Sequence, residues 1–217
     1  MKTLEIETVE FKKLNYLVHY YTDENYLFQT IMMYSKQNLN EVSANIVKNK
    51  TWFWERYRDT DRDNYYKRRY FVEKTMKKEF EEKYFKLSED VPVYFYLIPG
   101  INKEEVINNC NKRITLNNIT KALLIDIETV FNNKYITFTV NDSFRCYLKK
   151  SLDAGIDCSK SHYLGIPILE DHNKIFPIKD LMEINEKYKN TKIDYEVQIW
   201  EKDLLEKIKL NKNNYIN

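Results

Sequence analysis

The segment Asp194-Tyr195-Glu196-Val197-Gln198-Ile199-Trp200 decides how we interpret this chain, because it places one acidic side chain inside an aromatic and β-branched run. That composition predicts a β-strand, whose side chains alternate between two faces. One face, which we interpret as core, carries Tyr195, Val197 and Ile199. The other carries Asp194, Glu196, Gln198 and Trp200. There a carboxylate could line a pocket and orient a sugar hydroxyl or stabilise a cationic, sugar-like transition state. The alternative is a half-solvated edge strand.

Composition indicates one globular domain over residues 1–217, because 43% of the residues are hydrophobic and 15% are aromatic. A formal net charge of +2 is too balanced to indicate nucleic-acid binding by itself. Three cysteines without paired spacing favour a reduced, intracellular protein. The N-terminal residues lack the apolar core of a signal peptide, and no run approaches the roughly 18 apolar residues of a membrane span. We therefore expect a cytoplasmic protein that does not enter membranes.

Several common chemistries are excluded by residue type and spacing. The chain has only three glycines, so a P-loop or a Rossmann phosphate loop, which needs clustered glycine, does not fit. Cys158 and His162 have a permissible zinc-ligand spacing, but no second pair follows, and a closed zinc site needs four ligands. No serine lies in a glycine-flanked elbow that would indicate a hydrolase triad. We therefore expect no metal.

Near the N-terminus, a strand predicted at 14–21 leads into a helix predicted at 24–33. His19 and Thr22 lie at this junction, where free backbone amides of a helix N-terminus attract phosphate. The alternative for His19 is a partly buried histidine with its hydrogen bonds satisfied.

Arginine and tyrosine alternate between Arg56 and Tyr70, after a polar, loop-like stretch at 36–50 and an aromatic run at 51–58. The basic residues are Arg56, Arg58, Arg62, Lys67, Arg68 and Arg69. Such residues pair with phosphates and stack on bases, which indicates contact with a polyanion. The alternative is a solvated loop followed by an amphipathic helix, predicted at 65–86, in which Arg69 and Glu73 form a routine ion pair.

The remainder of the chain alternates strands and helices. Strands are predicted at 91–98, 122–127 and 135–140, and proline-interrupted, strand-like pieces at 162–169 and 175–178. Helices are predicted at 103–111, 179–189 and 204–210. Asn141 and Asp142 are expected to cap a short helix that carries Arg145.

Taken in order, these pieces resemble the ADP-ribosyltransferase superfamily, and most closely the DarT-type enzymes that modify DNA with NAD. The segments that carry the resemblance are His-Tyr-Tyr-Thr at 19–22, Val-Pro-Val-Tyr-Phe at 91–95, Phe-Thr-Val-Asn-Asp at 138–142 and Tyr-Glu-Val-Gln-Ile at 195–199. They span about four fifths of the chain. The chain departs from the family pattern by an additional aromatic residue in the first motif, by the absence of a glycine from the 138–142 turn, and by a basic aromatic insertion at 51–86.

The resemblance implies an α+β fold with a mixed, split β-sheet flanked by helices. It also implies that NAD is the substrate and that Glu196 is the catalytic residue that holds the ribose 2′-hydroxyl. In the resemblance, His19 and Thr22 would contact NAD. From the residues themselves we expect Tyr94 to stack on NAD, and Arg68 and Arg69 of the basic segment to pair with its phosphates. The acceptor would be DNA or protein. We expect it to contact Asn141 and Asp142 of the resembling turn, and Arg56 and Arg58 of the basic segment. Such a chain could be a toxin with an antitoxin partner, or a phage or defence factor. The alternative function is a non-catalytic module that binds nucleic acid or protein through 56–70.

Overall fold

The computed structural model describes residues 15–21, 27–28, 33, 62–99, 102–117, 121–159, 165–191 and 193–216. The strands of this part form one seven-stranded sheet in the order β5-β4-β6-β2-β1-β3-β7. Their bounds are β1 (Asn15–Tyr21), β2 (Val93–Pro99), β3 (Lys121–Asp126), β4 (Ile136–Val140), β5 (Phe176–Pro177), β6 (Tyr195–Ile199) and β7 (Tyr215–Ile216). The helices are α4 (Arg62–Lys83), α5 (Lys103–Asn117), α6 (Ser143–Cys146), α7 (Leu148–Asp153), α8 (Leu181–Lys187) and α9 (Lys202–Leu210). The α+β class predicted from the sequence is confirmed.

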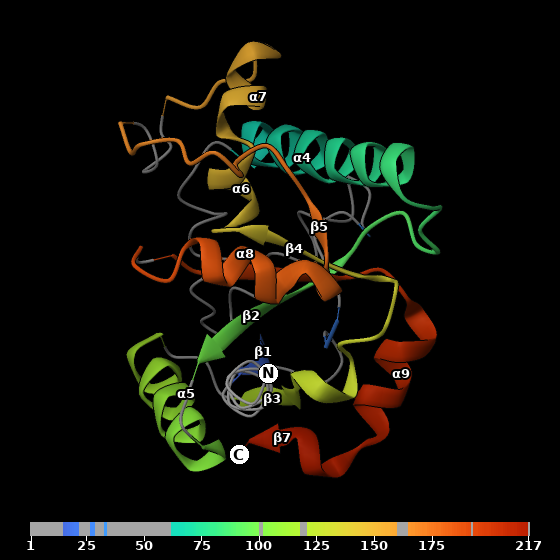
Figure 1. Ribbon diagram of the computed structural model, residues 1–217, viewed down its shortest axis with the longest axis vertical. Coiled ribbons are helices and arrows are strands. Elements are labelled where there is room, and N and C mark those ends of the chain that lie inside the picture. Colours follow the sequence, from blue (N-terminus) through green and yellow to red (C-terminus); the bar gives the residue numbers. More distant parts are fainter. Residues whose placement is uncertain are drawn as a thin grey trace, which may run out of the picture.

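All pairs between these strands are antiparallel, so the prediction of a mixed sheet is wrong for the described residues. The parallel contact that does occur is an isolated bridge between Asn141 and Tyr195. Continuously apolar strands are typical of parallel sheets because both of their faces are buried. Here helices cover both faces of an antiparallel sheet, which produces the same apolar pattern (Figure 1).

Strand β2 changes its pairing partner halfway along its length. Its first half, Val93 to Tyr96, pairs with β6, whereas its second half, Tyr96 to Pro99, pairs with β1. Tyr96 is opposite both Glu196 and Val18. Strands β1 and β6 therefore lie along different halves of β2, and Tyr96 marks the point where the partner changes.

The two faces of the sheet have different coverings. Directly opposite residues of an antiparallel pair lie on the same face, so Val18, Tyr96, Glu196 and Thr139 share one face. Helix α4 packs on this face through Val72, Met76 and Phe80, and α5 packs on its β1–β3 end through Val106 and Cys110. Figure 1 shows these two helices at opposite ends of the molecule.

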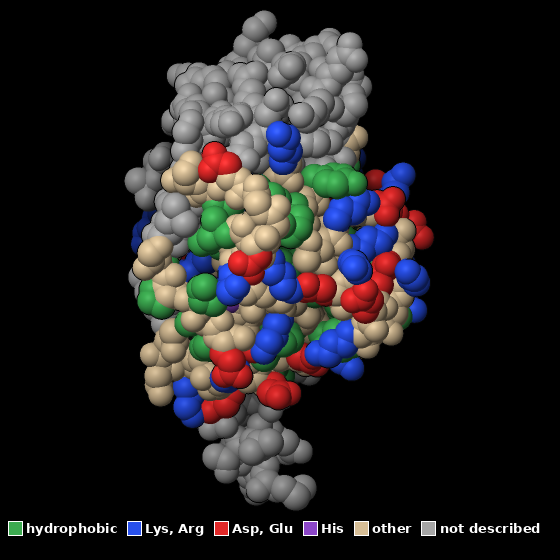
Figure 2. All heavy atoms as spheres, turned by 90° about the horizontal axis from the view of Figure 1, so that it is seen from above, with side chains coloured by type: hydrophobic (Ala, Val, Ile, Leu, Met, Phe, Trp, Pro, Cys, Tyr) green, Lys and Arg blue, Asp and Glu red, His purple; other side chains and the backbone are tan. Residues whose placement is uncertain are grey.

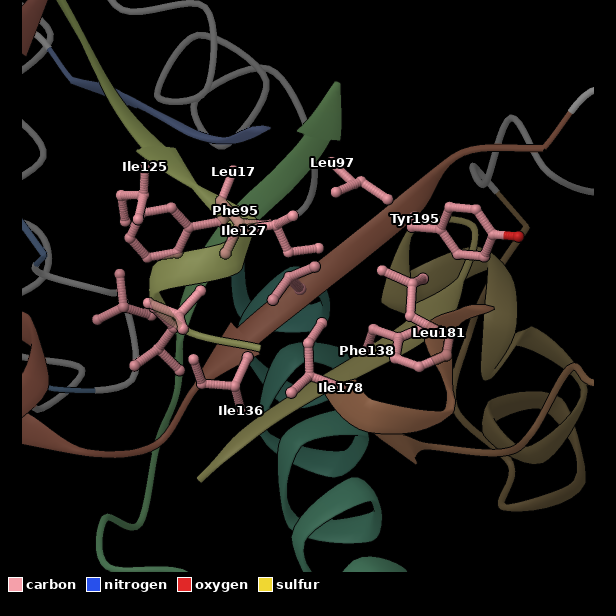
Figure 3. Packing of buried hydrophobic residues seen from close by; sticks show 14 of the residues in the cluster. Leu17, Phe95, Leu97, Ile125, Ile127, Ile136, Phe138, Ile178, Leu181 and Tyr195 are labelled. Carbon is pink, nitrogen blue, oxygen red and sulfur yellow. The ribbon is translucent and has the colours of Figure 1, made fainter. Parts of the chain in front are cut away.

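The largest cluster of buried apolar side chains lies on the opposite face (Figure 3). Phe95, Phe138 and Val197 project into it from three neighbouring strands, and each is 0% exposed. Leu181 and Ile184 of α8 and Leu205 and Ile208 of α9 cover this face. The apolar alternation predicted for residues 195–199 is thus confirmed.

Some predicted elements differ from the structure. Residues 165–169 contain no strand: Gly165 has a φ of 81°, and Ile166, Pro167 and Ile168 are exposed. Proline lacks the N–H that a strand needs for pairing, so this piece stays outside the sheet. Leu27 and Phe28 form a turn in which Phe28 has a φ of 66°, so the helix predicted at 24–33 does not pass through them. The rest of that segment, the loop predicted at 36–50 and the aromatic run at 51–58 lie outside the described residues, apart from Met33.

Other predicted elements are confirmed with shifted ends. The long basic helix runs from Arg62 to Lys83, and the helix predicted at 103–111 extends to Asn117. The segment predicted at 179–189 begins as a 3-10 turn at Ile178–Asp180 and continues as α8. Phe176–Pro177 forms an edge strand, as its proline indicates. None of the described helices is both long and apolar enough to span a lipid bilayer.

Candidate functional site

Glu196 lies near the centre of the sheet, with β4 on one side of its strand and β2 on the other. The residue is 3% exposed, and its Oε2 accepts a hydrogen bond of 2.9 Å from the backbone N–H of Ser143. The alternative prediction of a half-solvated edge strand is therefore wrong. The composition of this five-residue strand is compatible with an edge or a central position, and its pairing with both β4 and β2 makes it central.

A tight turn after β4 places the Ser143 N–H opposite Glu196. Asn141 adopts a φ of 66°, a left-handed conformation that asparagine tolerates better than most residues. Its N–H donates to the carbonyl of Asp194 at 2.7 Å, which joins the turn to the start of β6. Asp142 then accepts hydrogen bonds from Phe144 and Arg145 N–H as the N-cap of α6, so the predicted cap is confirmed.

Helix α4 brings a second buried carboxyl group to the same face. Glu73 is 1% exposed, and its Oε1 lies 3.9 Å from Arg69 Nε and accepts a hydrogen bond of 3.0 Å from the Tyr94 hydroxyl. The predicted intrahelical ion pair between Arg69 and Glu73 is therefore confirmed, and the structure shows in addition that it is buried. The spacing of four residues predicts that Arg69 and Glu73 share a face of the helix. It does not predict whether that face points to solvent or to the sheet.

Arg69 connects this carboxyl group to the turn that holds Glu196. Its Nη1 donates to Ser143 Oγ at 3.1 Å. Its guanidinium carbon lies 4.0 Å from the centre of the Phe144 ring and 4.7 Å from that of Tyr94. Both distances suit a cation–π contact. We call Arg69, Glu73, Tyr94, Ser143 and Glu196 the Arg69 cluster.

Burial controls the acidity of both carboxyl groups. Removal from water raises the pKa of Glu196 to about 7, and the nearby charge of Asp142 adds to this rise, while Arg69 and the hydrogen bonds from Ser143 oppose it. Burial likewise raises the pKa of Glu73 to about 7, against the opposing effects of Arg69 and the Tyr94 hydroxyl. The cluster therefore contains two carboxyl groups that change protonation near neutral pH.

Gln198 and Trp200, which share the face of Glu196, are committed to internal hydrogen bonds. Gln198 Nε2 donates to the carbonyl of Glu196 at 2.9 Å, and Gln198 Oε1 accepts from the Thr137 hydroxyl at 3.1 Å. Trp200 Nε1 donates to Thr137 Oγ1 at 2.8 Å. Because Gln198 and Trp200 are both 0% exposed, they support the strand rather than line an open pocket.

His19 lies on the other face of the sheet from the Arg69 cluster. Its ring centre is 5.1 Å from that of Phe95 and 5.3 Å from that of Phe28. Its Nδ1 lies 2.8 Å from the carbonyl oxygen of Tyr94, which can only accept, so Nδ1 carries the proton. Burial lowers the pKa of His19 to about 4. The structure thus brings His19 to the backbone of Tyr94 but not to its side chain, and Thr22 lies outside the described residues.

The basic segment contributes two buried arginines among the residues whose side chains are described. Arg68 and Arg69 are 8% and 7% exposed, and Arg68 Nη2 donates to the carbonyl of Phe144 at 2.7 Å. Arg56 and Arg58 lie outside the described residues. Lys67 and Tyr70 are the exposed neighbours of the buried pair. On the face of the molecule seen from above, Figure 2 shows acidic and basic side chains interspersed.

His172, which follows 141–145 by nearly thirty residues in the sequence, lies beside the 141–145 turn. His172 Nε2 is 3.1 Å from Asn141 Nδ2, and Arg145 Nη1 donates to Asn141 Oδ1 at 3.3 Å. Asn141 is 3% exposed, so its side chain is enclosed by these partners. No group of three or more potential metal ligands occurs among the residues with described positions.

Sequence reasoning missed Glu73 and Ser143. Glu73 was hidden by its routine helical spacing from Arg69, and Ser143 acts through its backbone N–H and a hydroxyl that no motif indicates. The only available signal was the cap at Asp142, which predicted that a helix would begin at this point. Comparison with protein-family models, curated proteins and solved structures finds no match to this chain.

Proposed function

We propose that this protein is an NAD-dependent ADP-ribosyltransferase in which Glu196 is the catalytic carboxylate. The observation that carries the proposal is the placement of Glu196: a nearly enclosed carboxyl group on a central strand, held by a main-chain N–H and within the influence of Arg69. A charge fixed in this way does not need to reorganise during the reaction, which is how preorganised groups stabilise a transition state.

The relative positions of the resembling segments support this proposal. His19 is on β1, Tyr94 on β2, Phe138 on β4 and Glu196 on β6. These strands are consecutive in the sheet, in the order β4-β6-β2-β1. Four short segments spread over about four fifths of the chain are thus adjacent in space. The change of partner along β2 is also in keeping with the split sheet that the resemblance implies.

The proposed chemistry assigns a separate task to each group. The Glu196 carboxylate accepts a hydrogen bond from the ribose 2′-hydroxyl and stabilises positive charge on the ribose as its bond to nicotinamide breaks. Nicotinamide leaves, and a nucleophilic atom of the acceptor bonds to the same ribose carbon and releases its proton to solvent. Ser143 N–H orients the carboxylate. Because the pKa of Glu196 is raised to about 7, turnover should increase as the pH rises through neutrality.

The acceptor in this proposal is a nucleic acid or a protein, and DNA is the acceptor that we propose to test first. Lys67 and Tyr70 are exposed next to the buried Arg68 and Arg69, so a cation and an aromatic ring are available near the site. A basic side chain can pair with a phosphate and an aromatic ring can stack on a base. The proposed roles of a toxin or a phage or defence factor rest on this acceptor.

The test is to compare wild type with Glu196→Gln in NAD turnover and in transfer of labelled ADP-ribose to DNA, RNA and protein. The amide keeps the shape of the side chain but loses its charge. We expect a loss of turnover of about 100-fold or more, which is about 2.7 kcal/mol in the barrier. NAD affinity, measured by calorimetry, should change little, because the charge acts mainly in the transition state.

Glu79→Gln is a matched control. Glu79 is also on α4 and also accepts a tyrosine hydroxyl, from Tyr147 at 3.1 Å, but it is not part of the Arg69 cluster. The NAD turnover of Glu79→Gln should equal that of wild type. Equal turnover in wild type and Glu196→Gln would remove Glu196 from the mechanism.

A second candidate function is a non-catalytic module that binds nucleic acid. The observation that favours it is the exposed face of α4. There Lys74 Nζ lies 5.8 Å from the centre of the Tyr70 ring, and Lys67 lies about one helical turn before Tyr70. In that case wild type would show no turnover of NAD with any acceptor. It would instead bind DNA or RNA with an affinity that falls steeply as salt is added, because phosphate pairing releases counterions.

A further inference from the structure

Two buried carboxyl groups lie around one guanidinium in the Arg69 cluster. Arg69 Nε is 3.9 Å from Glu73 Oε1, and the same guanidinium donates through Nη1 to Ser143, whose N–H holds Glu196. Burial raises the pKa of both carboxyl groups, and the positive charge of Arg69 opposes that rise in each. One cation therefore serves two anions that are too enclosed to be hydrated by bulk water.

The hydrogen bonds of Glu73 are incomplete. Oε1 accepts from the Tyr94 hydroxyl at 3.0 Å, but no donor among the described residues reaches Oε2, which is buried. Leaving a buried oxygen of a carboxyl group without a donor is costly. The Tyr94 hydroxyl and the Arg69 guanidinium are therefore the described groups that hold the Glu73 carboxyl group.

We propose that Glu73 is a positioning residue for Glu196: it pairs with the Arg69 guanidinium, and its negative charge offsets part of the positive charge that Arg69 presents to Glu196. Its role in turnover rests on the proposed function, whereas its effect on the protonation of Glu196 does not. Glu73 reaches Glu196 only through Arg69 and Ser143, so it is not itself a catalytic residue.

The charged and titratable groups around the pair come from each packed element. Helix α4 supplies Arg69 and Lys74, both of which favour ionised Glu73, and β2 supplies the Tyr94 hydroxyl. Asp142, the cap of α6, disfavours ionised Glu196. When Glu73 is ionised, its negative charge offsets part of the effect of Arg69 on Glu196. When Glu73 is neutral, that offset is absent, and Glu196 stays ionised to lower pH.

The experiment is a carboxyl carbon NMR titration of Glu196 in wild type, Glu73→Gln and Glu79→Gln, with the signal assigned by its loss in Glu196→Gln. We expect the titration of Glu196 to move down by about 0.5 pH unit or more in Glu73→Gln, because one competing charge is removed. Glu79→Gln should leave it in place. An unchanged or upward-shifted titration of Glu196 in folded Glu73→Gln would overturn the proposal.

Tyr94→Phe provides a second variant in case Glu73→Gln does not fold. It removes the hydroxyl that favours ionised Glu73, so Glu73 becomes neutral more readily. The midpoint of the Glu196 titration should again move to lower pH, by less than in Glu73→Gln. An unchanged titration in folded Tyr94→Phe would also count against the proposal.

The kinetic readout is the pH profile of NAD turnover. Its acid limb should move down in Glu73→Gln by the same amount as the NMR titration, which a purely structural role would not produce. An unmoved limb would overturn the role in turnover. If wild type turns over no NAD, the proposed function fails, while the NMR titration still decides whether Glu73 sets the protonation of Glu196.

Discussion

The two faces of β6 are equally buried but chemically opposite. One face carries Tyr195, Val197 and Ile199, which join the main apolar cluster. The other carries Glu196 and Gln198, which are 3% and 0% exposed and are held by hydrogen bonds from Ser143 and Thr137. The same five residues of backbone therefore separate an apolar core from an enclosed polar network.

This difference shows which side of the strand is built for stability alone. Burying an apolar side chain lowers the free energy of the folded state without further requirements. Burying a carboxyl group raises it unless partners compensate. The raised pKa values of Glu196 and Glu73 show that their partners compensate only in part. An incompletely compensated carboxyl group at the centre of a sheet is typical of a functional site.

The largest expected effect comes from emptying the apolar face. Phe138 is 0% exposed. The centre of its ring lies 5.4 Å from that of Phe176 in a stacked arrangement, and the ring of Tyr195 meets it edge-on. Phe138→Ala should lower the free energy of unfolding by about 3–5 kcal/mol, because a cavity remains where the ring was. Urea denaturation measures this loss.

Thr139→Ala is the neighbouring control on the polar face. It removes a hydroxyl that donates to the carbonyl of Asn141 at 3.0 Å, and its cost should be about 1 kcal/mol. Equal losses for the two variants would contradict the division into a stabilising face and a polar face.

The second prediction concerns the pH dependence of stability. The pKa of Glu196 rises from 4.5 to about 7 on folding, so its neutral form is favoured in the folded state. The stability associated with this shift is complete below pH 4.5 and is lost as the pH rises through 7. Between pH 5 and 8, wild type should lose on the order of 3 kcal/mol relative to Glu196→Gln. The measurement is the free energy of unfolding of wild type and of Glu196→Gln at a series of pH values. If the two curves were parallel, burial would not raise the pKa of Glu196 as described.

The smallest effect separates the two roles of Asp142. Asp142→Ala removes the N-cap of α6 and should cost about 1 kcal/mol, whereas Asp142→Asn keeps a capping oxygen and should cost only a few tenths. Both variants remove the charge that raises the pKa of Glu196, so its NMR titration should move down equally in both. If only Asp142→Ala moved it, the geometry of the turn rather than the charge of Asp142 would be responsible.

Local periodicity predicted most elements of the described fold. Strands such as 195–199 and the helix from Arg62 were recognisable because side-chain spacing and caps are local properties. The antiparallel pairing of the strands could not be predicted in this way, because an apolar strand buried on both faces has the same composition in a parallel and in an antiparallel sheet.

The candidate site could be predicted only in part. Glu196 stood out because an acid inside an apolar strand is unusual, and the structure places it in an enclosed cluster. Glu73 did not stand out, because an acid four residues after an arginine is common on helices. Its burial beside Tyr94 depends on how α4 packs on the sheet, which is a tertiary property. The separation of His19 from Glu196 by the sheet is tertiary as well.

The partner change along β2 has a mechanical consequence. Through Tyr96, one strand joins β5, β4 and β6 to β1, β3 and β7. A twist applied to either group reaches the other through this single strand and the helices packed on it. Amide hydrogen exchange should therefore resolve the sheet into two cooperative units that meet at residue 96, each opening with its own free energy.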